Sequence, residues 1–280
     1  MSVVREKSGI SRLRRFILYF VLSLIAATTI FPFFLMVMTS LKSGGALITQ
    51  LSQLIPHEIT PQNYIDVWKD DEFGLYFLNT LLITVATVLG NIVLDSMVAY
   101  ALSRKNFIGR HLILGIIVSS MMIPVQVLLI PIFVLMHRLH LYDTLWALIL
   151  PGIVQGFGIF LMKQYFDGLP HALDEAALID GASDWQIFWR VLMPLAKPAL
   201  AVLVINTSLT SWNAFLLPLI LTASKHTRTL ALGLALYQSQ YGIDYVHSMA
   251  AASISSLPIL AIFLIFQRNI IAGLTRGAVK

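Results

Sequence analysis

The sequence has no cysteine and few charged residues. None of its 280 residues is cysteine, and only 12% are Asp, Glu, Lys or Arg. The missing cysteine excludes disulfides, thiolate catalysis and Cys-based zinc or iron–sulfur sites. An ordinary soluble domain carries about 25% charged residues, so this chain has too few to cover the surface of a water-soluble globule of its size. Since 58% of the residues are hydrophobic, the composition indicates an integral membrane protein.

Six apolar runs are long enough to cross a bilayer. A hydrocarbon core of about 30 Å needs about 20 apolar residues in a helix, whereas barrel strands are about 10 residues long with alternating polarity. We therefore predict an all-α polytopic bundle with six transmembrane helices, forming one domain over residues 1–280. The predicted spans are roughly Phe16–Met38, Asn79–Leu102, Leu112–Met136, Thr144–Met162, Ala199–Leu221 and Met249–Phe266.

The basic residues are unevenly divided between the two sides of the predicted bundle. With the N-terminus inside, the inner segments carry 14 of the 19 Lys and Arg residues. Short loops rich in these residues stay in the cytoplasm. We therefore expect a multi-pass protein of the inner, cytoplasmic membrane with both termini in the cytoplasm. Because the basic charge follows the topology, we do not expect nucleic-acid binding.

The longest inner segment, about residues 163–198, has helical signals of its own. Gly181 suits the left-handed position that follows the last turn of a helix, which predicts a short helix over residues 171–180. Ser183 and Gln186 then form a capping box that opens a second helix. Spanning a bilayer does not explain two short helices that meet at a glycine outside it. Such a structure is typical of a surface that another protein contacts.

This inner segment resembles the EAA loop of ABC-importer permeases, whose usual form is EAA-x3-G-x9-I-x-L-P. Glu175–Ala177 and Gly181 stand at the matching positions, while Val191 and Met193 replace the isoleucine and leucine. Other stretches are similar to the carbohydrate-uptake branch of this family, which includes the smaller maltose permease subunit. Among them are Tyr100–Arg104, Met122–Gln126, Ile179–Ser183, Pro194–Ala199 and Ser211–Asn213.

The resemblance implies the type I ABC-importer permease fold and a set of partners. These are a second homologous permease subunit, two ATP-binding subunits and an extracytoplasmic solute-binding protein. It also implies that the first short helix is a coupling helix in a groove of an ATPase subunit. The residues that it assigns to ATPase coupling are Glu175, Ala176, Ala177, Asp180 and Gly181.

The chain has no phosphate-binding loop of the G-x-x-x-x-G-K-[ST] type. Without this loop it lacks the usual means of holding nucleotide phosphates. We therefore expect a transport subunit that is not itself an enzyme and binds no cofactor and no metal. ATP and Mg²⁺ would be used by the partner ATPase.

Neutral polar residues within the spans suit a path for a sugar or a related polyol. The candidates are Gln126, Ser211, Trp212 and Asn213. Each of them has an alternative role in hydrogen bonds between helices, which recur in membrane bundles. Ala214 stands where the branch usually has aspartate, so this chain lacks the carboxylate that could hydrogen-bond or contact the substrate in relatives.

Asp95 is the only ionisable side chain in the predicted spans. An intramembrane carboxylate is by default a hypothesis for a functional site, and the alternative function is a stand-alone ion- or proton-coupled secondary transporter. A proton relay usually recruits several such groups, and no second one lies in a span. We therefore favour a structural role for Asp95, in contact with interfacial water or paired with a basic neighbour.

The last outer loop, about residues 222–247, is the expected docking surface for the solute-binding protein. It contains several tyrosine and glutamine residues. Such side chains suit transient polar interfaces.

Overall fold

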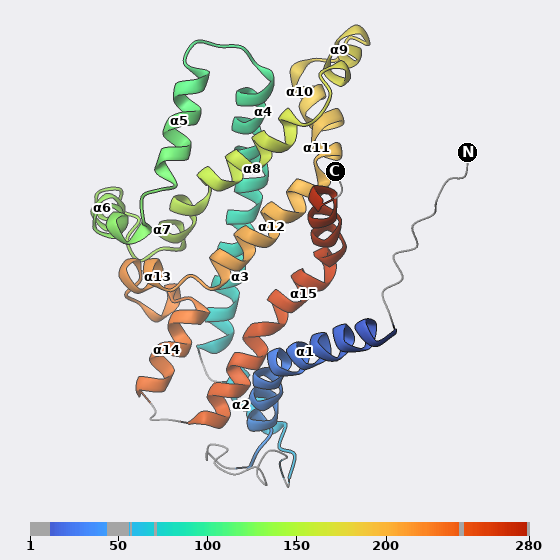
Figure 1. The fold of residues 1–280 in the computed structure, drawn as a ribbon. Coiled ribbons are helices and arrows are strands. Elements are labelled where there is room, and N and C mark those ends of the chain that lie inside the picture. Colours follow the sequence, from blue (N-terminus) through green and yellow to red (C-terminus); the bar gives the residue numbers. More distant parts are fainter. Residues whose placement is uncertain (1–11, 44–55, 57, 70–71, 241–243, 279–280) are drawn as a thin grey trace. The chain divides into compact units, whose positions relative to one another are not determined.

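In a computed structural model, the structure describes residues 12–43, 56, 58–69, 72–240 and 244–278. Every regular element in these ranges is a helix (Figure 1), which confirms the predicted all-α class. The contacts divide the chain into two parts, residues 1–67 with 241–254 and residues 68–240 with 255–280. The prediction of a single domain over residues 1–280 stays a prediction.

The first part contains α1 (Arg12–Ser40), most of α2 (Gln62–Lys69) and the beginning of α15 (Tyr245–Ala278). The apolar window of α1 has no buried residue within the protein, as expected for a helix surrounded by lipid. Its C-terminal end is fixed by α2. The Ser40 and Tyr64 hydroxyls lie 2.6 Å apart, and Asn63 Nδ2 donates to the Ser40 carbonyl oxygen at 2.7 Å.

The second part is built around a long helix from Phe73 to Arg104, in which α3 (Phe73–Gly90) passes through a π-helical turn (Asn91–Asp95) into α4 (Ser96–Arg104). α8 (Gly156–Asp167) packs along α4, and α12 (Lys197–Trp212) packs along α3 (Figure 1). The other helices of this part are α5 (Arg110–Ser120), α6 (Val125–Arg138), α7 (Leu145–Ile149), α9 (Ala172–Ile179), α10 (Asp184–Gln186), α11 (Met193–Leu195), α13 (Leu216–Leu221), α14 (Leu230–Gln240) and the remainder of α15.

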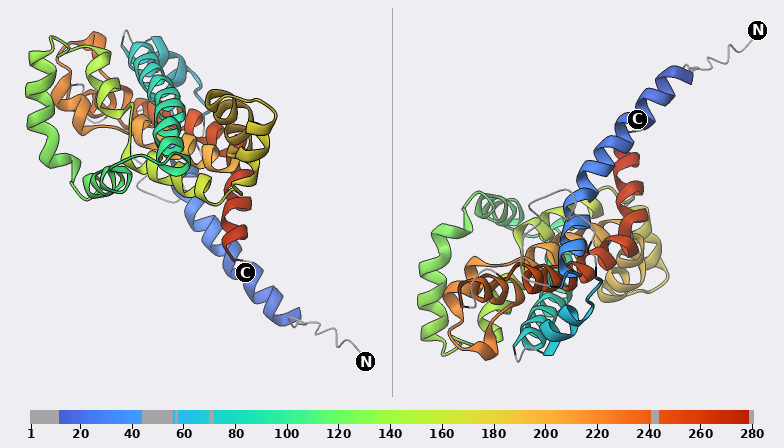
Figure 2. Two further views of the ribbon diagram at one scale, coloured as in Figure 1. Left: turned by 90° about the horizontal axis from the view of Figure 1, so that it is seen from above. Right: turned by 90° about the horizontal axis from the view of Figure 1, so that it is seen from below.

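Among the described residues, four helices are long and apolar enough to cross a membrane, and the number of candidate spans rises to as many as six if each of two bent helix pairs is one span. The predicted third span, 112–136, is one of these pairs. α5 and α6 meet at an angle of 102°, and α6 lies across the direction of α5 (Figure 2). Pro124 is the residue before α6 and has an extended backbone with ψ 134°. Proline also restricts the residue that precedes it, and with the extended backbone of Pro124 the helix is interrupted at this point.

The predicted fifth span, 199–221, is also interrupted. α12 ends at Trp212, and α13 begins only at Leu216. At its other end α12 continues a helical stretch, Asp184–Leu195, after a bend of 80°. The segment that leads to α12 therefore belongs to the structure around α9 as well as to the bundle.

A buried core connects the ends of α4 and α8 with this bent stretch. Phe166, Phe188 and Leu192 are among its fully buried side chains. Ala177 and Ala182, which flank the turn at Gly181, pack against the same core. The segment that carries α9 is therefore seated on the bundle by apolar contacts.

Candidate functional site

α9 ends in a Schellman motif at Gly181. This glycine has φ +80°, its N–H donates to the Leu178 carbonyl oxygen at 3.0 Å, and Ala182 N–H donates to the Ala177 carbonyl oxygen at 2.9 Å. Both bonds satisfy carbonyl groups that a helix end would otherwise leave open. The following helix begins with the predicted capping box between Ser183 and Gln186. The glycine turn and the capping box inferred from the sequence are thus both present.

One face of α9 projects away from the protein. Glu175 and Ala176 are exposed, as are Leu178 at 55% and Ile179 at 87%. Residues spaced three or four apart share a helix face, so Ala176 and Ile179 form an apolar surface beside Glu175. Two exposed aliphatic side chains on an eight-residue helix suit a surface that a protein partner covers.

The residues assigned to coupling lie on two sides of α9. Glu175, Ala176, Asp180 and Gly181 are exposed. Ala177 is instead half-buried and packs against the core of its own chain. The small side chain of Ala177 therefore allows α9 to approach the bundle closely.

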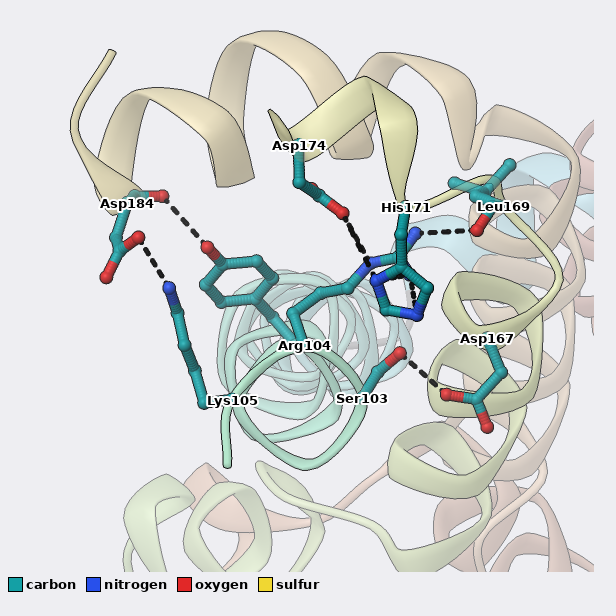
Figure 3. Close-up of polar contacts among 9 residues, drawn as sticks. Ser103, Arg104, Lys105, Asp167, Leu169, His171, Asp174 and Asp184 are labelled. Atoms are coloured by element: carbon teal, nitrogen blue, oxygen red, sulfur yellow. Dashed lines mark hydrogen bonds and ion pairs between the residues drawn. The ribbon is translucent and has the colours of Figure 1, made fainter. Parts of the chain in front are cut away.

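The opposite side of α9 is bound to the end of α4 by Arg104 (Figure 3). The Arg104 side chain is only 3% exposed, and its Nε lies 3.0 Å from Asp174 Oδ2. Its Nη2 donates to the Leu169 carbonyl oxygen at 3.0 Å, and its Nη1 lies 3.2 Å from the His171 ring nitrogens. These four residues, called the Arg104 cluster below, join the long helix to the first turn of α9.

A second contact joins α4 to the beginning of α10. Lys105 forms an ion pair with Asp184 (Figure 3). Its ammonium group lies 5.5 Å from the centre of the Tyr100 ring. Partial burial alone would lower the pKa of Lys105, but the hydrogen bond to Asp184 and the attraction of the neighbouring groups raise it in sum. Lys105 therefore stays charged. The end of α4 thus holds both helices that meet at Gly181.

The Arg104 cluster was missed by sequence reasoning. Arg104 stood out only as part of a stretch similar to the carbohydrate branch, and Asp174 precedes the EAA motif without belonging to it. Seventy residues separate the two partners. No periodicity in one sequence reports an ion pair over that separation.

A cavity of about 520 Å³, called the membrane cavity below, lies among α3, α7 and the α12–α13 break. Its polar lining is neutral and consists of hydroxyl and amide groups from Thr80, Thr87, Gln155, Thr210, Ser211, Asn213 and Thr229. The buried hydroxyls of Thr87 and Thr229 have no hydrogen-bond partner in the part of the chain that the structure describes. A buried hydroxyl without a partner is costly, so these two groups mark places where a polar molecule in the cavity would be held.

The predicted path residues divide between this cavity and other surroundings. Ser211 and Asn213 line it, as does Ala214. Trp212 is outside the lining: its ring is buried against Phe77, and its Nε1 donates to the Ser255 carbonyl oxygen at 3.0 Å. Gln126 is exposed near the beginning of α6 and is also outside the lining. The hydroxyls of Thr87 and Thr229 were missed because threonine is common in membrane helices and carries no signal by itself.

Asp95 is completely buried between α3–α4 and α8. Its Oδ1 accepts a hydrogen bond from the backbone N–H of Gln155 at 3.0 Å. Within the described ranges no basic side chain forms an ion pair with Asp95. Its carboxylate contacts the N-terminal end of α8 instead of the expected basic neighbour. A helix N-terminus favours a nearby negative group, and this contact agrees with the structural role expected for Asp95.

Gly158 provides the space that Asp95 occupies. A Cβ atom at this position would lie 2.0 Å from Asp95 Oδ2 and 2.9 Å from Leu203 Cδ1. We expect Gly158→Ala to destabilise the protein by about 1–3 kcal/mol, the usual cost of overpacking, measured as a lower melting temperature of the purified protein. Gly115→Ala on α5 is the matched control, because its Cβ would meet no atom within 4 Å. Equal melting temperatures of the two variants would refute this role.

Asp143 fixes the loop between α6 and α7 to the segment after α13. Its carboxylate accepts hydrogen bonds from the backbone N–H groups of Ala223 and Ser224 and from the Thr227 hydroxyl. Partial burial would raise the pKa of Asp143, but these hydrogen bonds outweigh it and lower the pKa to about 2.

Of the residues that suggested docking at the loop 222–247, Tyr241 lies outside the described ranges.

The family model described as "Binding-protein-dependent transport system inner membrane component" matches residues 96–276. The chain is 38% identical over 261 residues to the arabinooligosaccharides transport system permease protein AraQ of Halalkalibacterium halodurans, covering 91% of this chain and 93% of that protein. It is 34% identical over 273 residues to the diacetylchitobiose uptake system permease protein NgcG of Streptomyces coelicolor, covering 95% of this chain and 90% of that protein.

Among solved structures, the chain is similar to one from a bacterial ABC transporter involved in the import of the acidic polysaccharide alginate. The TM-score is 0.80 at 28% sequence identity, over 92% of this chain and 98% of that chain. The match extends over nearly all of both chains.

Proposed function

The chain belongs to the family of inner membrane components of binding-protein-dependent transport systems, and on this premise we propose that it is the membrane-spanning permease subunit of an ABC importer for carbohydrates. It is a multi-pass membrane protein, and the membrane cavity lies among helices of its second part. The observation that carries the proposal is the projecting apolar face of α9, fixed to the bundle by the Arg104 cluster.

The proposed substrate is an oligosaccharide. Both relatives named above take their names from oligosaccharides, and the similar structure comes from a polysaccharide importer. The membrane cavity agrees with this class because its polar groups are neutral and include two buried hydroxyls without partners. Hydroxyl-rich solutes offer both donors and acceptors to such groups.

α9 is proposed to be the coupling helix. Its exposed face, with Ile179 and Glu175, would lie in a groove of a cytoplasmic ATPase subunit. With six crossings, both termini of the chain would then be in the cytoplasm as well. A second homologous permease, two ATPase subunits that use ATP and Mg²⁺, and an extracytoplasmic binding protein would complete the transporter. This chain would supply half of the pathway and one coupling helix.

In this assembly the energy reaches the bundle through α9. Closure of the ATPase pair on ATP would move the two coupling helices together. Because the Arg104 cluster and Lys105 fix α9 and α10 to the end of α4, the movement would be passed to the long helix that carries Thr80 and Thr87 of the cavity lining. The cavity would then open outward to the binding protein, and hydrolysis would reset it.

A stand-alone secondary transporter that uses Asp95 is the alternative. Asp95 contacts the backbone at the N-terminal end of α8 and is not part of the lining of the membrane cavity. Such a transporter would also have no use for the exposed face of α9. Both observations favour the ABC permease.

The test is uptake by proteoliposomes that contain the complete complex, with the binding protein and labelled arabino-oligosaccharide or diacetylchitobiose outside and ATP inside. We expect uptake only when the ATPase subunits and ATP are both present. Uptake by the permeases without ATPase subunits would refute the proposal. Vesicles with a non-hydrolysable ATP analogue are the matched control, because they assemble the same complex without turnover.

A further inference from the structure

A second polar cavity lies at the end of α4, away from the membrane cavity. Its volume is about 470 Å³, and its lining comes from the end of α4, the beginning of α5, α8 and the residue before α9. We call it the basic cavity, since its lining includes Arg104, Arg110, Lys163 and His171. The two cavities share no lining residue.

The charges in the basic cavity are unequally compensated. Lys163 forms an ion pair with Asp167, which also accepts a hydrogen bond from Ser103 at 2.7 Å. Arg104 forms an ion pair with Asp174, as described above. Arg110 donates only to neutral groups, the Lys105 carbonyl oxygen at 3.3 Å and Asn106 Oδ1 at 3.0 Å. In the portion that the structure describes, no carboxylate forms an ion pair with Arg110, so its positive charge remains available to a ligand.

The turn beside this cavity has the character of a membrane-interface segment. Ile108 is fully exposed, Leu112 is 68% exposed and Phe107 is 42% exposed. Gly109, at φ +88°, makes the tight turn after Ile108. Apolar side chains next to basic residues are typical of segments that lie at the boundary of headgroups and acyl chains. This character suits a position of Arg110 at the depth of the lipid phosphates.

We infer that the basic cavity binds the phosphate group of an anionic phospholipid from the cytoplasmic leaflet. Arginine presents a planar set of donors that matches phosphate oxygens, and basic pockets on the cytoplasmic side of helix bundles bind anionic headgroups. The inference depends on the membrane orientation given under the proposed function. The ligand sits beside α4 and α9, so the site belongs to the part of the protein that joins the coupling helix to the bundle.

The test uses the complete transporter complex in detergent, titrated with phosphatidylglycerol or phosphatidylcholine and observed by native mass spectrometry. We expect retained phosphatidylglycerol on the wild type, weaker retention of phosphatidylcholine, and about fivefold weaker binding of phosphatidylglycerol by Arg110→Gln, the usual effect of one basic residue at a lipid surface. Arg190→Gln is the matched control, because it removes one exposed positive charge outside the cavity.

Three results would overturn the inference. They are equal retention by Arg110→Gln and the wild type, equal losses in Arg110→Gln and Arg190→Gln, and displacement of the lipid by millimolar inorganic phosphate, which would assign the cavity to a free phosphate. Each of these is read on an assembled complex that contains the ATPase subunits. Failure of that complex to form would instead count against the proposed function.

Discussion

Gly181→Asp is expected to abolish ATP-dependent uptake while the protein inserts in the membrane at its normal level. The left-handed backbone of this residue favours glycine, but aspartate is among the residues that tolerate it. A Cβ atom here would meet no atom within 4 Å, so the change strains the backbone of the turn at φ +80° but causes no clash with neighbouring atoms. What it alters is the exposed surface beside Ile179, where it adds a carboxylate to the face proposed to contact the ATPase.

Gly181→Asn distinguishes the effect of the added charge from the effect of a side chain on the backbone conformation. Asparagine has nearly the same size and also tolerates the left-handed conformation, but it adds no charge. We expect Gly181→Asn to retain part of the uptake and the binding of the ATPase subunits, measured by co-purification. Normal uptake by Gly181→Asp would contradict the docking role of this turn, as would equal loss of insertion by both variants.

Arg104→Ala is expected to reduce uptake at least tenfold and to destabilise the protein by about 3 kcal/mol, the lower end for a broken buried pair, because it leaves the half-buried Asp174 with only the His171 ring, at 4.0 Å, beside it. Asp174 is only 16% exposed in its side chain. Asp174→Asn should be milder, since Arg104 keeps its hydrogen bond to the Leu169 carbonyl oxygen and its contact with His171. The measurements are the melting temperature of the purified complex and its uptake rate.

Lys105→Ala is the matched control for Arg104→Ala. Lys105 is the next residue, its side chain is 40% exposed, and its partner Asp184 is 60% exposed. Exposed ion pairs contribute about 0–1 kcal/mol, so this variant should keep most of its stability. If Lys105→Ala and Arg104→Ala lose stability equally, burial of the Arg104 cluster is not what holds α9 in place.

The sequence contained enough local information to predict the helical class, the approximate membrane spans and the structure around Gly181. Span length follows from bilayer thickness, and Gly181 with the Ser183 capping box are signals read over a few neighbouring residues. These features depend on the composition of short segments. They are therefore visible without knowledge of the tertiary structure.

The 102° bend before Val125 was missed although Pro124 is a local signal, because the apolar composition is the same on both sides and hydropathy does not reveal the bend. Features that depend on distant residues could not be predicted. The pairing of Arg104 with Asp174, the contact of Asp95 with Gln155, and the burial of Trp212 against Phe77 depend on how the helices pack. Trp212 and Gln126 were assigned to the sugar path but lie outside the cavity lining. The sequence does not distinguish a residue that packs elsewhere from one that lines the cavity, because this also depends on how the helices pack.

The absence of cysteine allows the central claim to be tested directly by crosslinking. Ile179→Cys places a single thiol on the most exposed part of α9, and a short cysteine-to-lysine crosslinker can then be applied to the assembled complex. The account predicts a covalent product between this chain and an ATPase subunit. Ile59→Cys, which is also strongly exposed but lies on the proposed outer side, should give no such product. An intact complex in which Ile179→Cys never crosslinks to the ATPase would contradict the account.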